Sequence, residues 1–205
     1  MANLCEKLIG ACIAADCTNA PFTGMESKAF IANKSEIESV TYDQTNPNLI
    51  TAITMKEISS GVDAVLYSVT QLGKTPFTGT QTELVEGNTS NKFTETFAFT
   101  CPDNSPTAAN LLDNIANGKF VVFAQNQYSG SDNAGAWQVY GLKKGLVCTA
   151  MTRDPYSEDT DGQWAVTLTS ENVPNSAIFI QHMSSDATPV DDTATYLESL
   201  ADCGD

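Results

Sequence analysis

Apolar and small polar residues alternate over several short stretches of the chain, which is the pattern of half-buried β-strands. The clearest stretch is "KFTETFAFT" at residues 92–100. Its phenylalanine face also holds one carboxylate, Glu95, and its opposite face carries only threonine and alanine. We expect the first face to be buried and the second to be smooth and uncharged. Further strands are expected near Phe30 and at residues 49–58, 62–72, 119–128, 136–142, 145–154, 163–170 and 176–181.

One segment has a helical pattern instead, namely "SPTAANLLDNIANG" at residues 105–118. Ser105 can cap the first turn, and Pro106 suits the first helical position. Gly118 is expected to end the helix in the left-handed conformation. The expected apolar stripe consists of Ala108, Leu111, Leu112 and Ile115.

Residues 49–58 and 62–72 are two β-rich runs separated by "SSG", and we expect them to pair as an antiparallel hairpin. Both faces of the first run carry apolar side chains. The next residues, 73–91, contain three glycines and one proline. A loop of this length is unusual in a compact domain. The segment is therefore functional, ordered only in an assembly, or contains a short strand near residues 83–85.

The order of these elements predicts a mainly β (α+β) fold without βαβ alternation. We expect a β-sandwich or partly closed barrel of antiparallel strands, with one helix packed at an end. Residues 1–26 are expected to form an N-terminal arm with a short helix, and residues 27–181 the β domain. Residues 182–205 are expected to form an acidic, weakly structured C-terminal tail, with a short helix near residues 196–200.

The chain has 205 residues, the size of one domain with extensions. It carries 25 Asp and Glu against 10 Lys and Arg, which gives a net charge of −15. Nucleic-acid-binding proteins neutralise phosphates with Lys and Arg, so this composition argues against tight binding of DNA or RNA. No apolar run approaches the roughly 18 residues that span a membrane, and we expect no membrane association.

The cysteines show no C-x-x-C spacing, and a chain of this size does not need a disulfide framework. We expect reduced thiols, made in a cytosol. The first three cysteines are interpreted as one side of the N-terminal helix rather than as a metal site. The six cysteines are Cys5, Cys12, Cys17, Cys101, Cys148 and Cys203.

The sequence offers no catalytic set, and we expect a protein that is not an enzyme and needs no cofactor. His182 is the single histidine of the sequence and is interpreted as an exposed residue near the C-terminal tail. Asp63 and Glu95 are single carboxylates within strands, so neither forms the pair that a glycosidase requires. The sequence also has no glycine-rich nucleotide-binding motif.

A cluster of carboxylates lies between the strands expected at residues 145–154 and 163–170. Its sequence "SEDTDG" resembles the start of an EF-hand loop, but Ser157 occupies the first position and Leu168 the place of the bidentate glutamate. We favour a solvated hairpin tip that protects a sheet edge. A calcium site of another geometry is the alternative, formed by Asp154, Glu158, Asp159 and Asp161.

Three segments together resemble a known family: the strands at residues 49–72, the run "KFTETFAFT…SPTAANLLDNIANGKFVVFAQN", and the close "AWQVYGLKKGLVCTAMTRD…DTDGQWAVTLTS". In order and composition they are similar to the tail tube proteins of long-tailed bacteriophages. This fold is shared with the inner-tube subunits of contractile injection machines. The resemblance covers roughly residues 27–181.

The resemblance implies a structural virion protein whose hexameric rings stack into a tube, through which DNA passes at ejection without tight binding. Long hairpins of the subunits join edge to edge into an inner barrel. The implied partners are copies of the chain, a tape measure protein and a tail terminator, and the implied location is the virion tail after synthesis in the host bacterial cytoplasm. The implied inter-subunit strands contain Leu49, Ile50, Thr51, Ile53, Met55, Val62, Val65 and Tyr67.

Two alternatives stay open at this point. The chain could be a secreted β-sandwich binding module, calcium-dependent and directed to carbohydrate, which predicts a thermal shift with calcium and oxidised cysteines. It could also be another head–tail or tail component of a phage.

Overall fold

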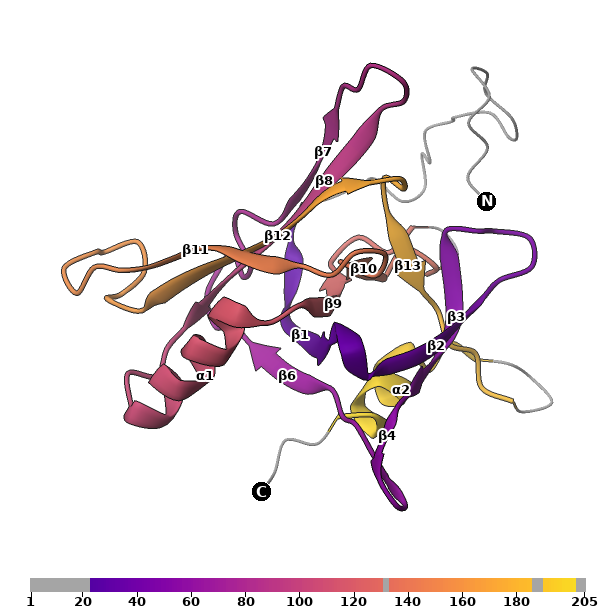
Figure 1. The fold of residues 1–205 in the computed structure, drawn as a ribbon, viewed down its shortest axis with the longest axis horizontal. Coiled ribbons are helices and arrows are strands. Elements are labelled where there is room, and N and C mark those ends of the chain that lie inside the picture. Colours follow the sequence, from indigo (N-terminus) through magenta and orange to yellow (C-terminus); the bar gives the residue numbers. More distant parts are fainter. Residues whose placement is uncertain (1–22, 131–132, 186–189, 202–205) are drawn as a thin grey trace.

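The computed structural model describes residues 23–130, 133–185 and 190–201. The fold is mainly β, as expected: two antiparallel-rich sheets pack on one another, and helix α1 (Pro106–Asn117) packs beside them (Figure 1). In these residues no helix is both long and apolar enough to cross a membrane.

The larger sheet has seven strands, and its neighbours are antiparallel except for one parallel pair, β13 with β3. A short 3-10 helix, η1 (Lys34–Glu36), joins β1 to β2. The strand order is β2 (Ile37–Tyr42), β3 (Leu49–Met55), β13 (Ile178–Ile180), β10 (Trp137–Tyr140), β9 (Phe120–Asn126), β1 (Met25–Asn33) and β6 (Tyr67–Thr70).

The smaller sheet has four antiparallel strands formed by two hairpins. Its order is β11 (Val147–Arg153), β12 (Trp164–Val173), β8 (Lys92–Cys101) and β7 (Gln81–Val85). The hairpins pair through their inner strands β12 and β8, and their tips project in different directions from the body (Figure 1). The alternation predicted for β8 is confirmed, because Phe97 and Phe99 are buried while Thr96, Ala98 and Thr100 are half-exposed.

The core has two parts, one on each side of the seven-stranded sheet. The part between the sheets joins Phe97 and Leu168 of the smaller sheet to Leu112 of α1. The other part packs Phe30 and Trp137 under helix α2 (Thr193–Ser199), whose Leu197 is fully buried. The expected short C-terminal helix is therefore present, and it docks on the body.

Helix α1 begins as the sequence predicts but ends differently. The Ser105 side chain accepts a hydrogen bond from the Ala108 N–H at 3.2 Å. Gly118 is extended, with φ −87° and ψ 174°, so the expected left-handed end is wrong. Glycine is needed there because a Cβ would lie 2.2 Å from the ring of Phe120. Leu111 of the expected apolar stripe is exposed.

The expected hairpin of residues 49–58 with 62–72 is also wrong. Strand β3 pairs with β2 and β13, whereas β6 lies at the opposite edge of the seven-stranded sheet. Only β4 (Glu57–Ser59) and β5 (Val62–Asp63) pair locally. The chain between β5 and β6 is held in the core, because Leu66 is fully buried and its N–H donates to the Leu200 carbonyl at 2.8 Å.

A register shift explains why strand β3 has apolar residues at both odd and even positions of its sequence. Tyr42 pairs with Ile50 and Thr41 pairs with Ala52, so Thr51 is an extra residue in the ladder. Such a bulge reverses the orientation of the residues beyond it. Residues 50, 53 and 55 therefore all reach the same core.

Three further outcomes concern the segments around these strands. Residues 37–42, where the sequence pattern predicts no strand, form β2, and residues 73–91 contain β7, which confirms the short-strand alternative. Cys101 and Cys148 are free thiols, as expected. The expected N-terminal helix lies outside the described residues, as do Cys5, Cys12, Cys17 and Cys203.

Candidate functional site

The outer side of the two central strands carries an uncharged surface over residues 94–100 and 165–169, which we call the Thr/Ala face; Glu83 and Lys92 lie beyond it on the same side of the sheet. Its strands alternate strictly, so the apolar side chains of β8 and β12 fill the core while small polar ones remain outside. Thr167 pairs with Ala98 and Thr169 with Thr96, which places these residues in adjacent rows. The Thr/Ala face consists of Thr94, Thr96, Ala98 and Thr100 of β8 with Ala165, Thr167 and Thr169 of β12, all half-exposed.

The two edge strands of this sheet, β7 and β11, each pair with one neighbouring strand in the described residues. In the described parts of the chain, β7 pairs only with β8, and β11 pairs only with β12. Leu84 of β7 and Val147 of β11 are exposed at 57% and 38%. Exposed edges with apolar side chains promote association with further strands unless they are covered.

The four carboxylates singled out from the sequence lie on the loop between β11 and β12, residues 154–163, which we call the acidic tip (Figure 1). Asp154 accepts the Tyr156 N–H at 2.9 Å, and Arg153 donates to the Gly162 carbonyl at 3.1 Å. Over the described residues, no group of three or more His, Cys, Asp or Glu side chains is placed to hold a metal ion. The hairpin is as expected, and its carboxylates point into solvent rather than toward a common centre.

Glu95 of β8 is the one carboxylate that the described core encloses, with 4% of its surface exposed. It accepts the Gly141 N–H at 2.7 Å, which ties the smaller sheet to the turn after β10. Burial raises the pKa of the Glu95 carboxyl, and the hydrogen bond from Gly141 only partly offsets this effect.

Two hydroxyl groups flank Glu95 across the sheet. Ser170 of β12 and Thr82 of β7 are its direct cross-strand neighbours, and the hydroxyl oxygen of each is buried without a hydrogen-bond partner. The sequence pattern places Glu95 on the buried face, but this alignment depends on strand register, which the sequence does not specify. Burial, followed by the negative charge of Glu95, raises the pKa of the nearby Tyr140.

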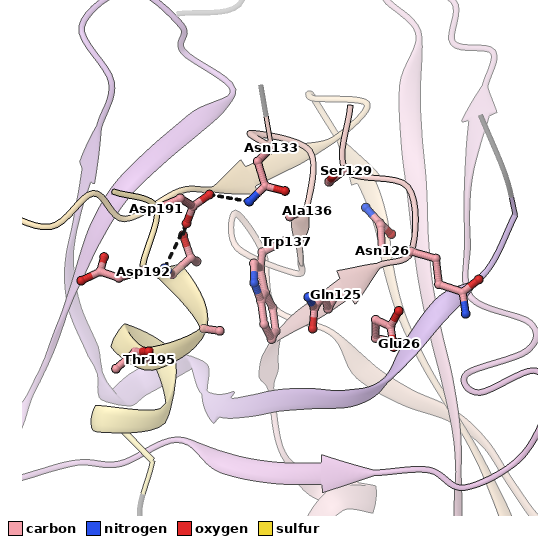
Figure 2. A pocket seen from close by; sticks show the side chains of 13 residues that line it. Glu26, Gln125, Asn126, Ser129, Asn133, Ala136, Trp137, Asp191, Asp192 and Thr195 are labelled. Carbon is pink, nitrogen blue, oxygen red and sulfur yellow. Dashed lines mark hydrogen bonds between the residues drawn. The ribbon is translucent and has the colours of Figure 1, made fainter. Parts of the chain in front are cut away.

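A polar cavity of about 240 Å³ lies beside the start of α2. Asp191 and Asn133 lie on one side of it, and Asn126 and Glu26 lie on the other (Figure 2). Trp137 forms part of the wall but is only 4% exposed, so it offers no open ring for stacking a sugar.

The Asp191 carboxylate, which lines this cavity, already accepts hydrogen bonds from other residues of the protein. It accepts hydrogen bonds from Asn133 at 2.8 Å and from the Thr193 hydroxyl at 2.6 Å. Burial opposes its ionisation, but the hydrogen bonds from Thr193, Gln181 and Asn133 outweigh burial and lower the pKa of Asp191. The Asp191 carboxylate therefore holds the turn that leads into α2. Its lowered pKa makes it poorly suited to accept a proton from a substrate.

His182 is not the exposed residue expected from the sequence. Its Nδ1 lies 2.6 Å from the Asp192 carboxylate, and its ring stacks on Tyr196 with 4.0 Å between the ring centroids. These contacts half-bury the imidazole and fix it against α2. No local sequence pattern indicates this arrangement, because the partners Asp192 and Tyr196 lie ten and fourteen residues away.

The residues assigned to inter-subunit strands from the resemblance are dispersed in the structure. Ile50, Ile53 and Met55 are buried in the chain's own core. Leu49 and Thr51 are half-buried, and Val62 is exposed on β5. Val65 and Tyr67 line an apolar groove of about 920 Å³ between β6 and α1.

Comparison of the chain with protein-family models, with curated proteins and with solved structures returned no match.

Proposed function

We propose that the chain is a tail tube subunit, whose hexameric rings stack into a hollow conduit for DNA. The observation that carries this proposal is the four-stranded sheet. It combines an uncharged, half-exposed Thr/Ala face with two margins that are unpaired in the described chain. Edges of this kind are completed when further strands pair with them, and ring closure removes them altogether.

The strand directions support closure by copies of the same sheet. The sheet has four strands, all antiparallel to their neighbours, so β11 and β7 run in opposite directions. Strand β7 of one copy can therefore pair with β11 of the next in the antiparallel sense that the sheet already uses. In this proposal β11, β12, β8 and β7 form the inner barrel, in place of residues 49–72.

The Thr/Ala face supports the role of a DNA conduit. With this face turned inward, its threonines and alanines offer no Lys or Arg that could bind a phosphate, and Lys92 at the start of β8 is the one basic residue of the two central strands. Each copy also contributes a net charge of −15, which repels a polyanion. DNA would pass without tight binding, while a tape measure protein and a tail terminator would bind elsewhere on the assembly.

Negative-stain electron microscopy of the purified protein tests the proposal directly. We expect rings with a central hole, or tubes, and a strictly monomeric species at high concentration in light scattering would contradict the proposal. The edge pairing is tested by introducing Glu83→Cys on β7 and Ala150→Cys on β11 in a background where serine replaces Cys5, Cys12, Cys17, Cys148 and Cys203, so that the buried Cys101 is the native thiol that remains. Mild oxidation should give a covalent ladder that ends at a closed ring, while controls that carry one of the two introduced cysteines should not.

A further inference from the structure

Four lysines gather at the end of the four-stranded sheet where β11 begins, and we call them the lysine patch: Lys34, Lys119, Lys143 and Lys144. The Lys34 N–H donates to the Lys119 carbonyl at 2.8 Å. A Cβ on Gly145 would lie 3.2 Å from the Lys119 Cβ and 3.5 Å from the Lys34 Cγ. Burial, followed by the positive charge of Lys143, lowers the pKa of Lys34. The patch holds four of the chain's 10 basic residues.

No carboxylate of the described chain neutralises the lysine patch by an ion pair within 4 Å. Lys143 donates to the Tyr42 hydroxyl at 2.7 Å, and Lys144 donates to the backbone carbonyl of Glu171 at the same distance. Lys119 is exposed. A cluster of uncompensated positive charge is unusual on a chain whose net charge is −15, and it is a surface that attracts an acidic partner.

The acidic tip has the complementary charge and lies at the other end of the same hairpin. Its four carboxylates are exposed, and none of them forms an ion pair with a residue of the described chain. The seven residues of β11 separate the lysine patch from the acidic tip, which corresponds to about 24 Å of extended strand. The two surfaces therefore cannot meet within one copy.

We propose that the acidic tip of one subunit docks on the lysine patch of a second copy in the adjacent ring. This inference rests on the proposed ring, because lateral pairing through β7 and β11 directs the strand ends along the tube axis. A contact between different surfaces of identical chains repeats head to tail and builds an open stack. Each exposed ion pair is weak alone, but the contact recurs around a rigid ring, so the weak pairs act together.

Charge reversal tests the contact better than added salt, because salt also screens the net repulsion between copies. The patch variant carries Lys143→Glu and Lys144→Glu, and the tip variant carries Glu158→Lys and Asp159→Lys. Matched controls change the same charges elsewhere, at Lys56 and Lys74 or at Asp63 and Asp113, all exposed. Ring and tube populations are counted by negative-stain microscopy and sedimentation velocity.

We expect each variant to form single rings with at least a tenfold loss of stacked tubes, while the controls stack like the wild type. Combining both reversals in one chain, or mixing the two variants in equal amounts, should restore stacking because the reversed positions of the tip and the patch again face opposite charges. Patch and tip variants that stack normally, or folded combined variants that do not stack, would overturn the docking contact alone. A wild type that forms neither rings nor tubes would instead overturn the proposed function, and the contact with it.

Discussion

Replacing Glu95 with glutamine should change how the stability of the protein depends on pH. Glutamine keeps an acceptor for the Gly141 N–H at this 4%-exposed position but cannot ionise. Burial raises the pKa of Glu95 in the folded state, so the folded protein favours the neutral carboxyl. The stabilisation by that neutral group is complete below the unfolded-state pKa of about 4.3 and is lost as the pH rises through the higher folded-state pKa.

The magnitude follows from linkage and from the hydrogen bond. Between pH 4 and 8, Glu95→Gln should gain stability relative to the wild type by about 1.4 kcal/mol for each unit by which folding raises the pKa. Glu95→Ala should instead lose about 1–3 kcal/mol at pH 4, because it leaves the buried Gly141 N–H without its acceptor.

Urea unfolding followed by tryptophan fluorescence at several pH values measures both effects. Glu171→Gln is the matched control, because the same chemical change is made on an exposed residue of β12. A constant difference between wild type and Glu95→Gln from pH 4 to 8 would refute the reasoning, since it would mean that burial does not perturb the titration of Glu95.

Three further substitutions test the packing by urea unfolding. Ser105→Ala removes the α1 cap and should cost about 1 kcal/mol, whereas an unchanged midpoint would contradict the cap. Gly118→Ala places a methyl group against Phe120 and should cost about 1–3 kcal/mol, with Asn117→Ala as the neighbouring control. Leu197→Ala should cost about 2–5 kcal/mol and expose α2 to amide exchange; exchange confined to the last turn would argue against core docking.

The sequence was sufficient wherever the structure depends on local pattern. The alternation of β8, the cap at Ser105 and the acidic hairpin tip are each specified by residues close together in the chain. The Thr/Ala face could be predicted for the same reason, because strict alternation places every second residue of β8 and β12 outside.

The sequence was insufficient wherever partners are distant. The extra residue at Thr51 shifts the ladder of β3, and two-residue periodicity carries no sign of it. The contact between Glu95 and Gly141 spans 46 residues, and the stacking of His182 on Tyr196 needs the turn before α2. The two adjacent β-rich runs favoured a hairpin at residues 49–72. In the structure Leu66 is buried in the core between them, and strands β3 and β6 lie far apart in the seven-stranded sheet.

The insertion of β13 between β3 and β10 has a consequence for the order of folding. Strands β2 and β3 leave the ribosome early, yet β13 alone joins them to the rest of the seven-stranded sheet. That bridge is short, with two parallel residue pairs, Phe179 with Leu49 and Ile180 with Ile50. Strands β2 and β3 must therefore wait for residues 178–180 before they join the rest of the sheet, and nascent chains that stop earlier should keep β2 and β3 accessible to proteases.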